Sequence, residues 1–145
     1  IAITTALKSN NEIISSLIFN PIKDEIFYAE KNNGAFFNNH RIRVSKKSKL
    51  NDCLFVTGGK IIKEPDLPYR KSGCAALDMA YVAAGRYDGY FQHNLNLWDI
   101  AAGIIIVKEA GGIVSKINMS INKNIKIIAS SADINGKLLE KLNNF

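Results

Sequence analysis

A carboxylate stands next to a strongly apolar segment at Trp98-Asp99. The residues after it, through Gly103, are small or apolar and predict a helix that starts on Asp99. Two interpretations follow for this acid. It could be a plain N-cap, favoured by the helix dipole, or it could be held on a buried helix start and coordinate a hard cation through oxygen. Trp98 is expected to exclude water beside it. The residue types alone leave both interpretations open.

A second stretch, Arg70-Lys71-Ser72-Gly73-Cys74-Ala75-Ala76-Leu77-Asp78, starts another helix on glycine and small residues. Such a start leaves backbone N–H groups accessible to a ligand, and two basic residues stand just upstream. Close packing of the helix against a sheet would explain the same small residues. The pattern therefore indicates either an anion-binding helix start or a tightly packed one.

The elements that position these residues are of two kinds. The first third of the chain reads as an antiparallel meander, because β-rich runs are separated by Asn-rich turn formers and by Pro21. The predicted strands are Ile1–Lys8, Glu12–Phe19, Glu25–Glu30, Ala35–Asn38 and Arg41–Val44.

The remainder alternates strands and helices. The helical segments run from Gly73 to a stop at Gly85, from Asp99 to Ala110, and from Asp133 to Leu142, the last capped by Ser131 or Asp133. The predicted strands are Asn51–Thr57, Arg86–Gln92, Ile113–Lys116 and Ile125–Ser130. Strands first and mixed units later indicate a layered α/β or α+β sandwich and not a doubly wound sheet. We expect one domain over residues 1–145, with an antiparallel portion at 1–58 and a C-terminal α/β portion at 70–145.

Composition sets bounds on the class of protein. The chain has 145 residues, 47% hydrophobic and 22% charged, which is ordinary for one globular domain. It has no apolar run long enough to span a membrane. Two isolated cysteines, Cys53 and Cys74, predict free thiols in a reducing compartment and, with no visible export signal, a cytoplasmic location. A net charge of +6 suits anionic substrates or nucleic acid, but the lysines are scattered and read as solvated.

The two candidate stretches become specific when they are taken together. The chain contains the pattern Arg70-x-x-Gly73-Cys74-Ala75-Ala76-Leu77-Asp78-x-Ala80-Tyr81-Val82-Ala83-Ala84-Gly85-Arg86-x-Asp88-Gly89-Tyr90, followed by Trp98-Asp99-x-Ala101-Ala102-Gly103 and Glu109-Ala110-Gly111-Gly112. Taken together, these motifs resemble the C-terminal signature of the inositol monophosphatase family. Gly34-Ala35-Phe36-Phe37-Asn38 with Arg41-Ile42-Arg43-Val44-Ser45 looks like the family's middle hairpin, and Ile127-Ile128-Ala129-Ser130-Ser131 like its last strand.

This resemblance implies the fold of that family and a chemistry. Family members hydrolyse phosphate monoesters with Mg²⁺ ions and an activated water. Asp99 matches the family's late metal ligand and is therefore the expected catalytic and metal-binding residue. Gly73, Cys74 and Ala75 are the expected substrate-binding residues, Ala75 matching the position whose backbone touches the substrate's alcohol portion. A homodimer is a further expectation.

Gln92 stands where many inositol-specific members have a glutamate that binds ring hydroxyls. An amide offers a donor as well as an acceptor, so preference among inositol, other sugar, nucleotide and histidinol phosphates stays open. The residues of the two main motifs match the inositol-specific branch of the family more closely, and inositol-1-phosphate is therefore the expected substrate.

The resemblance also shows departures. The family's early glutamate ligand and its Asp-Pro-x-Asp-Gly-Thr loop would precede Ile1, and no such loop occurs in the chain. One carboxylate cannot hold two Mg²⁺ ions, so the chain alone is expected to lack appreciable phosphatase activity. Only 15 residues separate Thr57 from Gly73, fewer than in many members. Without preceding helices, the apolar face near Ile1, Ile3, Ile14 and Phe19 would be exposed.

Other acids in the chain stand in no comparable setting and are read as turn or surface residues: Asp24, Asp52, Asp66 and Asp133. Two further function classes stay open beside the enzyme. One is an RNA-associated regulatory protein of the same family, which the net charge permits but no motif supports. The other is a catalytically inactive structural or dimerising module.

Overall fold

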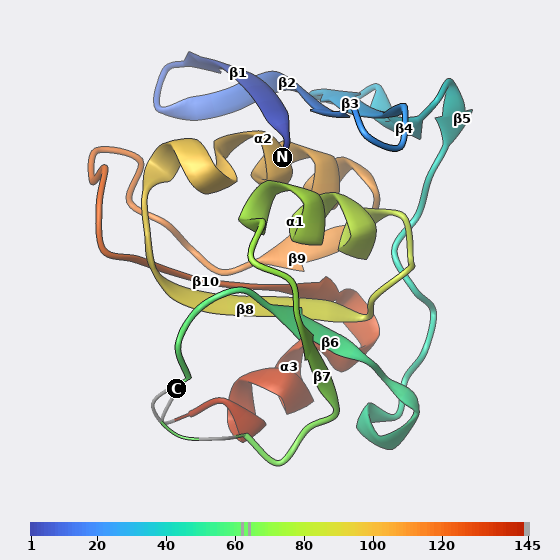
Figure 1. The fold of residues 1–145 in the computed structure, drawn as a ribbon, viewed down its shortest axis with the longest axis vertical. Coiled ribbons are helices and arrows are strands. Elements are labelled where there is room, and N and C mark those ends of the chain that lie inside the picture. Colours follow the sequence, from blue (N-terminus) through green and yellow to red (C-terminus); the bar gives the residue numbers. More distant parts are fainter. Residues whose placement is uncertain (62, 64, 144–145) are drawn as a thin grey trace.

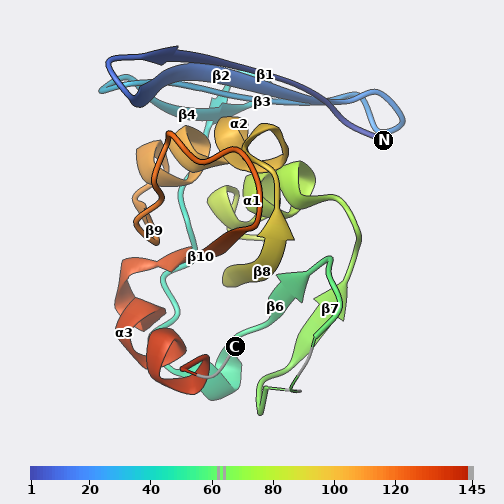
Figure 2. The ribbon, with the colours of Figure 1, turned by 90° about the vertical axis from the view of Figure 1, so that its left-hand side faces the viewer.

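The layers of the molecule are two five-stranded sheets with helices α1 (Ala75–Ala83) and α2 (Leu97–Glu109) between them (Figure 2). Helix α3 (Ala132–Lys141) lies on the other side of the second sheet (Figure 1). The computed structural model describes residues 1–61, 63 and 65–143. This arrangement confirms the predicted layered α/β sandwich and places the two candidate stretches in the helical layer between the sheets.

The first sheet is an antiparallel meander in chain order. Its strands are β1 (Ile3–Ser9), β2 (Glu12–Asn20), β3 (Glu25–Glu30), β4 (Gly34–Phe37) and β5 (His40–Arg41). The last strand is shorter than the predicted one, because the backbone leaves the sheet soon after it pairs. The N–H of Val44 donates to the carbonyl of Ala110 at 3.0 Å, at the end of α2, so the chain is already crossing to the second layer there.

The second sheet is mixed, in the order β7-β6-β8-β10-β9. Its strands are β6 (Phe55–Thr57), β7 (Tyr69–Lys71), β8 (Gly89–Leu95), β9 (Gly112–Val114) and β10 (Ile125–Ser131). Strand β6 pairs in parallel with β7 and β8, and the other pairs are antiparallel.

Three predictions about this second sheet are corrected by the structure. Strand β6 belongs here and not to the antiparallel portion placed at 1–58, and a short 3-10 helix, η1 (Leu50–Asp52), precedes it. Strand β7 was not predicted, since it is a three-residue edge strand without apolar alternation. Strand β8 begins three residues later than predicted, because the N–H groups of Arg86 and Tyr87 still bond the carbonyl of Tyr81 at the end of α1.

The helical layer is buried on both sides, which explains its apolar sequence. Helix α2 keeps seven of its residues buried, from Ile100 to Val107. The helices α1 and α2 pack tightly at Gly103, where an added Cβ would lie 2.6 Å from the Cβ of Met79. Only glycine fits at that position without moving one of the helices.

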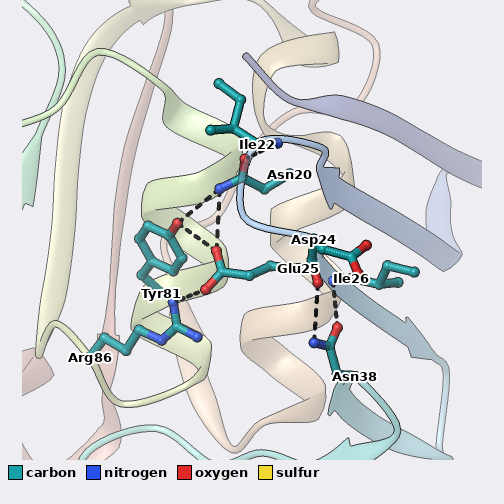
Figure 3. Close-up of polar contacts among 8 residues, drawn as sticks. All are labelled: Asn20, Ile22, Asp24, Glu25, Ile26, Asn38, Tyr81 and Arg86. Carbon is teal, nitrogen blue, oxygen red and sulfur yellow. Dashed lines mark hydrogen bonds and ion pairs between the residues drawn. The ribbon is translucent and has the colours of Figure 1, made fainter.

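A polar network joins the first sheet to the end of α1 (Figure 3). The Arg86 guanidinium forms an ion pair with Glu25 at 2.6 Å, and the Tyr81 hydroxyl donates to the same carboxylate at 2.9 Å. The Asn20 amide also donates to it, at 3.3 Å. Burial alone would raise the pKa of Glu25, but the hydrogen bonds from Arg86 and Tyr81 outweigh it and lower that pKa. The network therefore holds the meander against the helical layer.

The outer face of the first sheet carries the predicted apolar surface. Ile1 and Ile3 are 85% and 55% exposed, and Leu7 is 56% exposed. Ile14 and Phe19 are half-buried, so exposure there is only partial. The face is therefore uncovered over β1 and better shielded over β2.

Two expectations from composition can be compared with the structure. Both cysteines are free, as predicted: Cys53 is buried, whereas Cys74 is half-buried. Across the residues that the structure describes, none of the helices has the length and apolar character needed to cross a bilayer.

Candidate functional site

A cavity of about 390 Å³ opens between the starts of the two central helices and strand β8. It collects every residue predicted for the site from the sequence: Gly73, Cys74, Ala75, Gln92 and Asp99. Its other lining residues are Trp98, which was expected beside Asp99, and five that sequence reasoning did not assign to the site: Ala2, Thr4, Ala76, Asn94 and Leu95. The two stretches, separated by more than a helix and a strand along the chain, therefore form one site.

The start of α1 presents its backbone to this cavity. Gly73 adopts φ +91°, a conformation that side chains disfavour, and turns the chain into the helix. Cys74 is the N-cap and makes no side-chain cap hydrogen bond. Because nothing caps this end, first-turn N–H groups remain without an intrahelical partner and can bind an anion.

The loop before α1 is stabilised by the buried carboxylate of Asp78, on the side away from the cavity. The Ser72 hydroxyl donates to the Asp78 carboxylate at 2.5 Å and accepts the N–H of Cys74 at 3.3 Å. Asp78 is only 1% exposed, and burial raises its pKa to about 6 although the Ser72 hydrogen bond works in the opposite direction. Asp78 does not line the cavity. The motif contained this residue, but only the fold shows that it supports the loop.

The start of α2 is closed by its own side chains. The helix begins at Leu97, two residues before the predicted start, and its N-cap is Asn96. Asp99 is the third helical residue and completes a capping box: its Oδ2 accepts the N–H of Asn96 at 2.9 Å, and the Asn96 side chain accepts the N–H of Asp99. Asp99 is therefore a capping residue, though not the N-cap itself.

The second oxygen of Asp99 keeps the metal interpretation possible. Oδ1 has no hydrogen bond to the described part of the chain, and Asp99 lines the cavity. One carboxylate oxygen thus fixes the helix start while the other can meet a cation. Trp98 is 58% exposed, so the prediction that it excludes water from Asp99 is wrong.

Gln92 is fixed on the opposite wall by its carbonyl oxygen. Oε1 accepts the N–H of Gly58 at 3.0 Å and the hydroxyl of Tyr90 at 2.8 Å. A Cβ on Gly58 would lie 2.7 Å from that oxygen and 3.2 Å from Gly73 Cα, so the Gly58 backbone is wedged between both walls. Burial, with the negative charges of Asp78 and Asp99, raises the pKa of Tyr90 well above its ordinary value. The sequence signal that could have indicated this contact is the Gly58-Gly59 pair.

The residues present can be tested against the Mg²⁺ that the sequence resemblance implies. Within residues 1–61, 63 and 65–143, no group of three or more His, Cys, Asp or Glu side chains gathers that could hold a metal. The acids predicted to be turn or surface residues are exposed: Asp24, Asp52, Asp66 and Asp133. The described chain therefore supplies one oxygen ligand at the cavity and does not fit a complete Mg²⁺ site.

Comparisons with known proteins agree with the geometry. A sequence profile described as the inositol monophosphatase family matches residues 1–144. The chain is 40% identical over 126 residues to the inositol-1-monophosphatase of Rhizobium meliloti, covering 77% of this chain and 47% of that protein. It is 37% identical over 131 residues to the Nus factor SuhB of Escherichia coli, covering 79% and 48%.

Solved structures give the same result. The structure of an IMPase from Thermotoga maritima superposes with a TM-score of 0.89 at 36% identity, covering 99% of this chain and 61% of that one. The chain thus spans about half the length of the curated relatives named above. The profile covers nearly every residue, and two of the motifs that carry the likeness, at residues 73–76 and 98–99, line the cavity. The chain belongs to the inositol monophosphatase family.

Proposed function

We propose that this chain forms the substrate-binding half of the active site of a Mg²⁺-dependent phosphatase that hydrolyses phosphate monoesters. The observation that carries the proposal is the single cavity shared by the uncapped start of α1 and the carboxylate of Asp99. A phosphate monoester bound with its cation needs these two opposite features side by side.

The residues of this chain would bind the phosphate monoester and orient it in the cavity. The N–H groups of Gly73 and Ala75 would hold the ester through backbone donors, beside Cys74, whose own N–H is bound by Ser72, and Gln92 would contact the alcohol portion of the ester. Asp99 would supply one oxygen ligand to Mg²⁺. When bound, Mg²⁺ activates a water and neutralises charge on the leaving oxygen. The remaining ligands would have to come from outside the residues that the structure describes.

Inositol-1-phosphate is the substrate that we propose, because the residues of the two main motifs match the inositol-specific branch of the family and a relative at 40% identity is an inositol-1-monophosphatase. Nucleotide and histidinol phosphates are the competing substrates, and Gln92 is the position where they would be distinguished. A homodimer and a cytoplasmic location belong to the same proposal, drawn from the family and from the two free cysteines.

Phosphate release from inositol-1-phosphate, with and without Mg²⁺, tests the proposal. The 145-residue chain is expected to show no appreciable turnover. If the coding sequence upstream encodes an Asp-Pro-x-Asp-Gly-Thr loop, the longer product should turn over, and Asp99→Asn should lower its rate by about 100-fold or more. Mg²⁺-dependent turnover by the 145 residues that Asp99→Asn abolishes would contradict the expected inactivity. A longer product that carries the loop but shows no such turnover would contradict the phosphatase itself.

An RNA-associated regulatory role is the second candidate, since the chain carries a net charge of +6 and resembles a Nus factor at 37% identity. Phosphate contacts release counterions, so RNA affinity in this case should fall steeply as salt rises. Filter binding of an RNA at several salt concentrations measures that slope. A purely structural dimerising module would show neither turnover nor RNA binding, but sedimentation would still find a dimer.

A further inference from the structure

A second cavity, of about 300 Å³, lies at the end of α2 that is remote from Asp99. Three segments line it: residues 43–46 after β5, Ala110 and Gly111 at the end of α2, and residues 131–133 at the start of α3. Among the described residues, none lines both this cavity and the one that contains Asp99. Helix α2 has 13 residues and is therefore about 20 Å long, so the two cavities are well separated.

Backbone contacts hold the three segments together. The chain after β5 runs down the side of the molecule, past the end of the second sheet at which α3 begins (Figure 1). The N–H of Val44 donates to the carbonyl of Ala110 at 3.0 Å, which fixes this chain against the end of α2. Ser131 pairs with Gly112 in the ladder between β10 and β9, which fixes the start of α3 beside the same end. The walls of the cavity are therefore held by the main chain.

The start of α3 supplies hydrogen-bond donors to this cavity. The helix has ten residues, and its N-cap, Ser131, makes no side-chain cap hydrogen bond. Ala132 and Asp133 line the cavity, and their N–H groups have no acceptor within the helix because they belong to its first turn. The positive end of the helix dipole therefore lies at the cavity, where it favours an anion.

The Ser131 side chain is a second and independent feature of this cavity. Ser131 is 2% exposed and lines the cavity, and its Oγ has no hydrogen-bond partner in the described chain. The other buried side-chain oxygen in this condition among the described residues is Oδ1 of Asp88, which does not line the cavity. An unpaired buried hydroxyl is unfavourable, and an anion in the cavity would give it an acceptor.

The charges around the cavity are positive on balance. Arg43 and Lys46 line it, are exposed, and form no ion pair with the described part of the chain. The carboxylate of Asp88 is already ion-paired with Lys47 at 3.0 Å. Asp133 is the one acidic residue among those that line the cavity, and it opposes an anion. Two free cations thus outweigh one carboxylate.

We propose that this cavity is a second anion-binding site that takes a phosphate group. Three kinds of donor meet there: two free cations, the first-turn N–H groups of α3 and a buried hydroxyl without a partner. A phosphate group has several oxygen acceptors, and it binds both to helix starts and to arginine. The group could belong to a free phosphate or to an RNA backbone. The proposal does not depend on the proposed phosphatase activity, because it uses no residue of the cavity that contains Asp99.

Amide ¹H–¹⁵N spectra of the chain, titrated with inorganic phosphate at constant ionic strength, test the proposal. The amides of Gly111, Ala132 and Asp133 should shift together, with one dissociation constant. Because each amide is followed separately, these shifts are distinguished from any at the start of α1. Sodium chloride should not reproduce them, since screening acts on all exposed charges alike.

Two variants should change the affinity in opposite directions. Arg43→Gln removes a cation and should weaken phosphate binding at α3 about fivefold, whereas Asp133→Asn removes the opposing charge and should strengthen it about threefold. Both residues are exposed, so the fold should persist. Ser131→Ala should weaken binding about threefold without loss of stability, because the hydroxyl makes no hydrogen bond in the free chain.

The matched control is Arg41→Gln. Arg41 is also exposed, but it does not line the cavity, and its guanidinium lies against Gly34, 3.0 Å from the position of an added Cβ. This variant should change the affinity by less than about 1.5-fold. A single-stranded RNA oligonucleotide then identifies the source of the phosphate group. Shifts of the same amides at lower concentrations of RNA than of phosphate assign it to an RNA backbone, and shifts with inorganic phosphate alone assign it to a free phosphate.

Several results would overturn the proposal. One is that neither phosphate nor RNA shifts the amides of Gly111, Ala132 and Asp133, and another is that sodium chloride shifts them equally. The proposal also fails if Arg43→Gln and Asp133→Asn bind phosphate as the wild type does, or if Arg41→Gln weakens binding as much as Arg43→Gln. An unchanged affinity in Ser131→Ala would overturn the role of the buried hydroxyl.

Discussion

The two helix starts that face the cavity each carry an aspartate in the first turn, yet the two acids are used differently. In α1, Asp78 is 1% exposed, turns away from the cavity and supports the loop through Ser72. The N–H groups of that helix start are uncapped. In α2, Asp99 closes the helix start through a capping box and still lines the cavity.

This difference gives the site its polarity. The uncapped start of α1 keeps the positive end of its dipole available, and the capped start of α2 presents a negative carboxylate instead. An acid in the first turn is therefore no guide to function by itself. What decides is whether its oxygens point into the cavity or are enclosed by the loop behind it.

The strongest test of this contrast is the pH dependence of stability at Asp78. Its pKa in the folded chain is about 6, against an ordinary value of 3.8. Between these values the folded state holds a proton that the unfolded state has lost, so stability falls as pH rises from about 4 to about 6. The loss from this group is at most about 3 kcal/mol, and Asp78→Asn should remove it.

Urea unfolding of both proteins at pH 4.5 and pH 7.5 measures that difference. Asp78→Asn keeps an acceptor for Ser72, so the loop should stay intact. Asp66→Asn serves as the matched control, because the Asp66 side chain is 96% exposed and should leave the pH dependence unchanged. Equal pH dependence of the wild type and Asp78→Asn would show that the buried acid is ionised without penalty.

A smaller effect should distinguish the two roles of Asp99. Asp99→Ala removes the capping oxygen and should lower the free energy of unfolding by about 1 kcal/mol. Asp99→Asn keeps an oxygen for the N–H of Asn96 and should lower it by less than about 0.5 kcal/mol. Thermal or urea unfolding of the two variants checks the order. Equal destabilisation would mean that the charge, and not the hydrogen bond, stabilises this helix start.

The smallest expected effect is at the uncapped helix. Cys74→Ser places a hydroxyl at the N-cap of α1 and should stabilise the chain by a few tenths of a kcal/mol, up to about 1. The same hydroxyl would occupy an N–H that now faces the cavity, so affinity for inorganic phosphate should fall. Unfolding and phosphate titration of one sample measure both changes. A stabilised variant that binds phosphate with undiminished affinity would show that the free N–H groups are not the anion site.

Much of this site could be predicted from the sequence, because its residues lie in two short motifs at helix starts. The meander was also predictable, since asparagine turns and strand alternation are local signals. Strand β7 was not, because Tyr69–Lys71 becomes a strand only by pairing with β6. The role of Gln92 depends on Gly58, which lies 34 residues away along the chain and across the cavity, and no local pattern specifies that contact. Asp78 and Ser72 are only six residues apart, but the burial that makes Asp78 a support of the loop comes from the tertiary packing around it.

The close packing of α1 against α2 at Gly103 determines the width of the cavity. Because an added Cβ would lie 2.6 Å from Met79 Cβ, this contact sets how near α1 and α2 lie to each other. Both helices carry their part of the cavity on their first turns, so the separation between the start of α1 and Asp99 depends on a glycine one turn beyond Asp99. A methyl group there would widen the cavity without altering any residue that lines it.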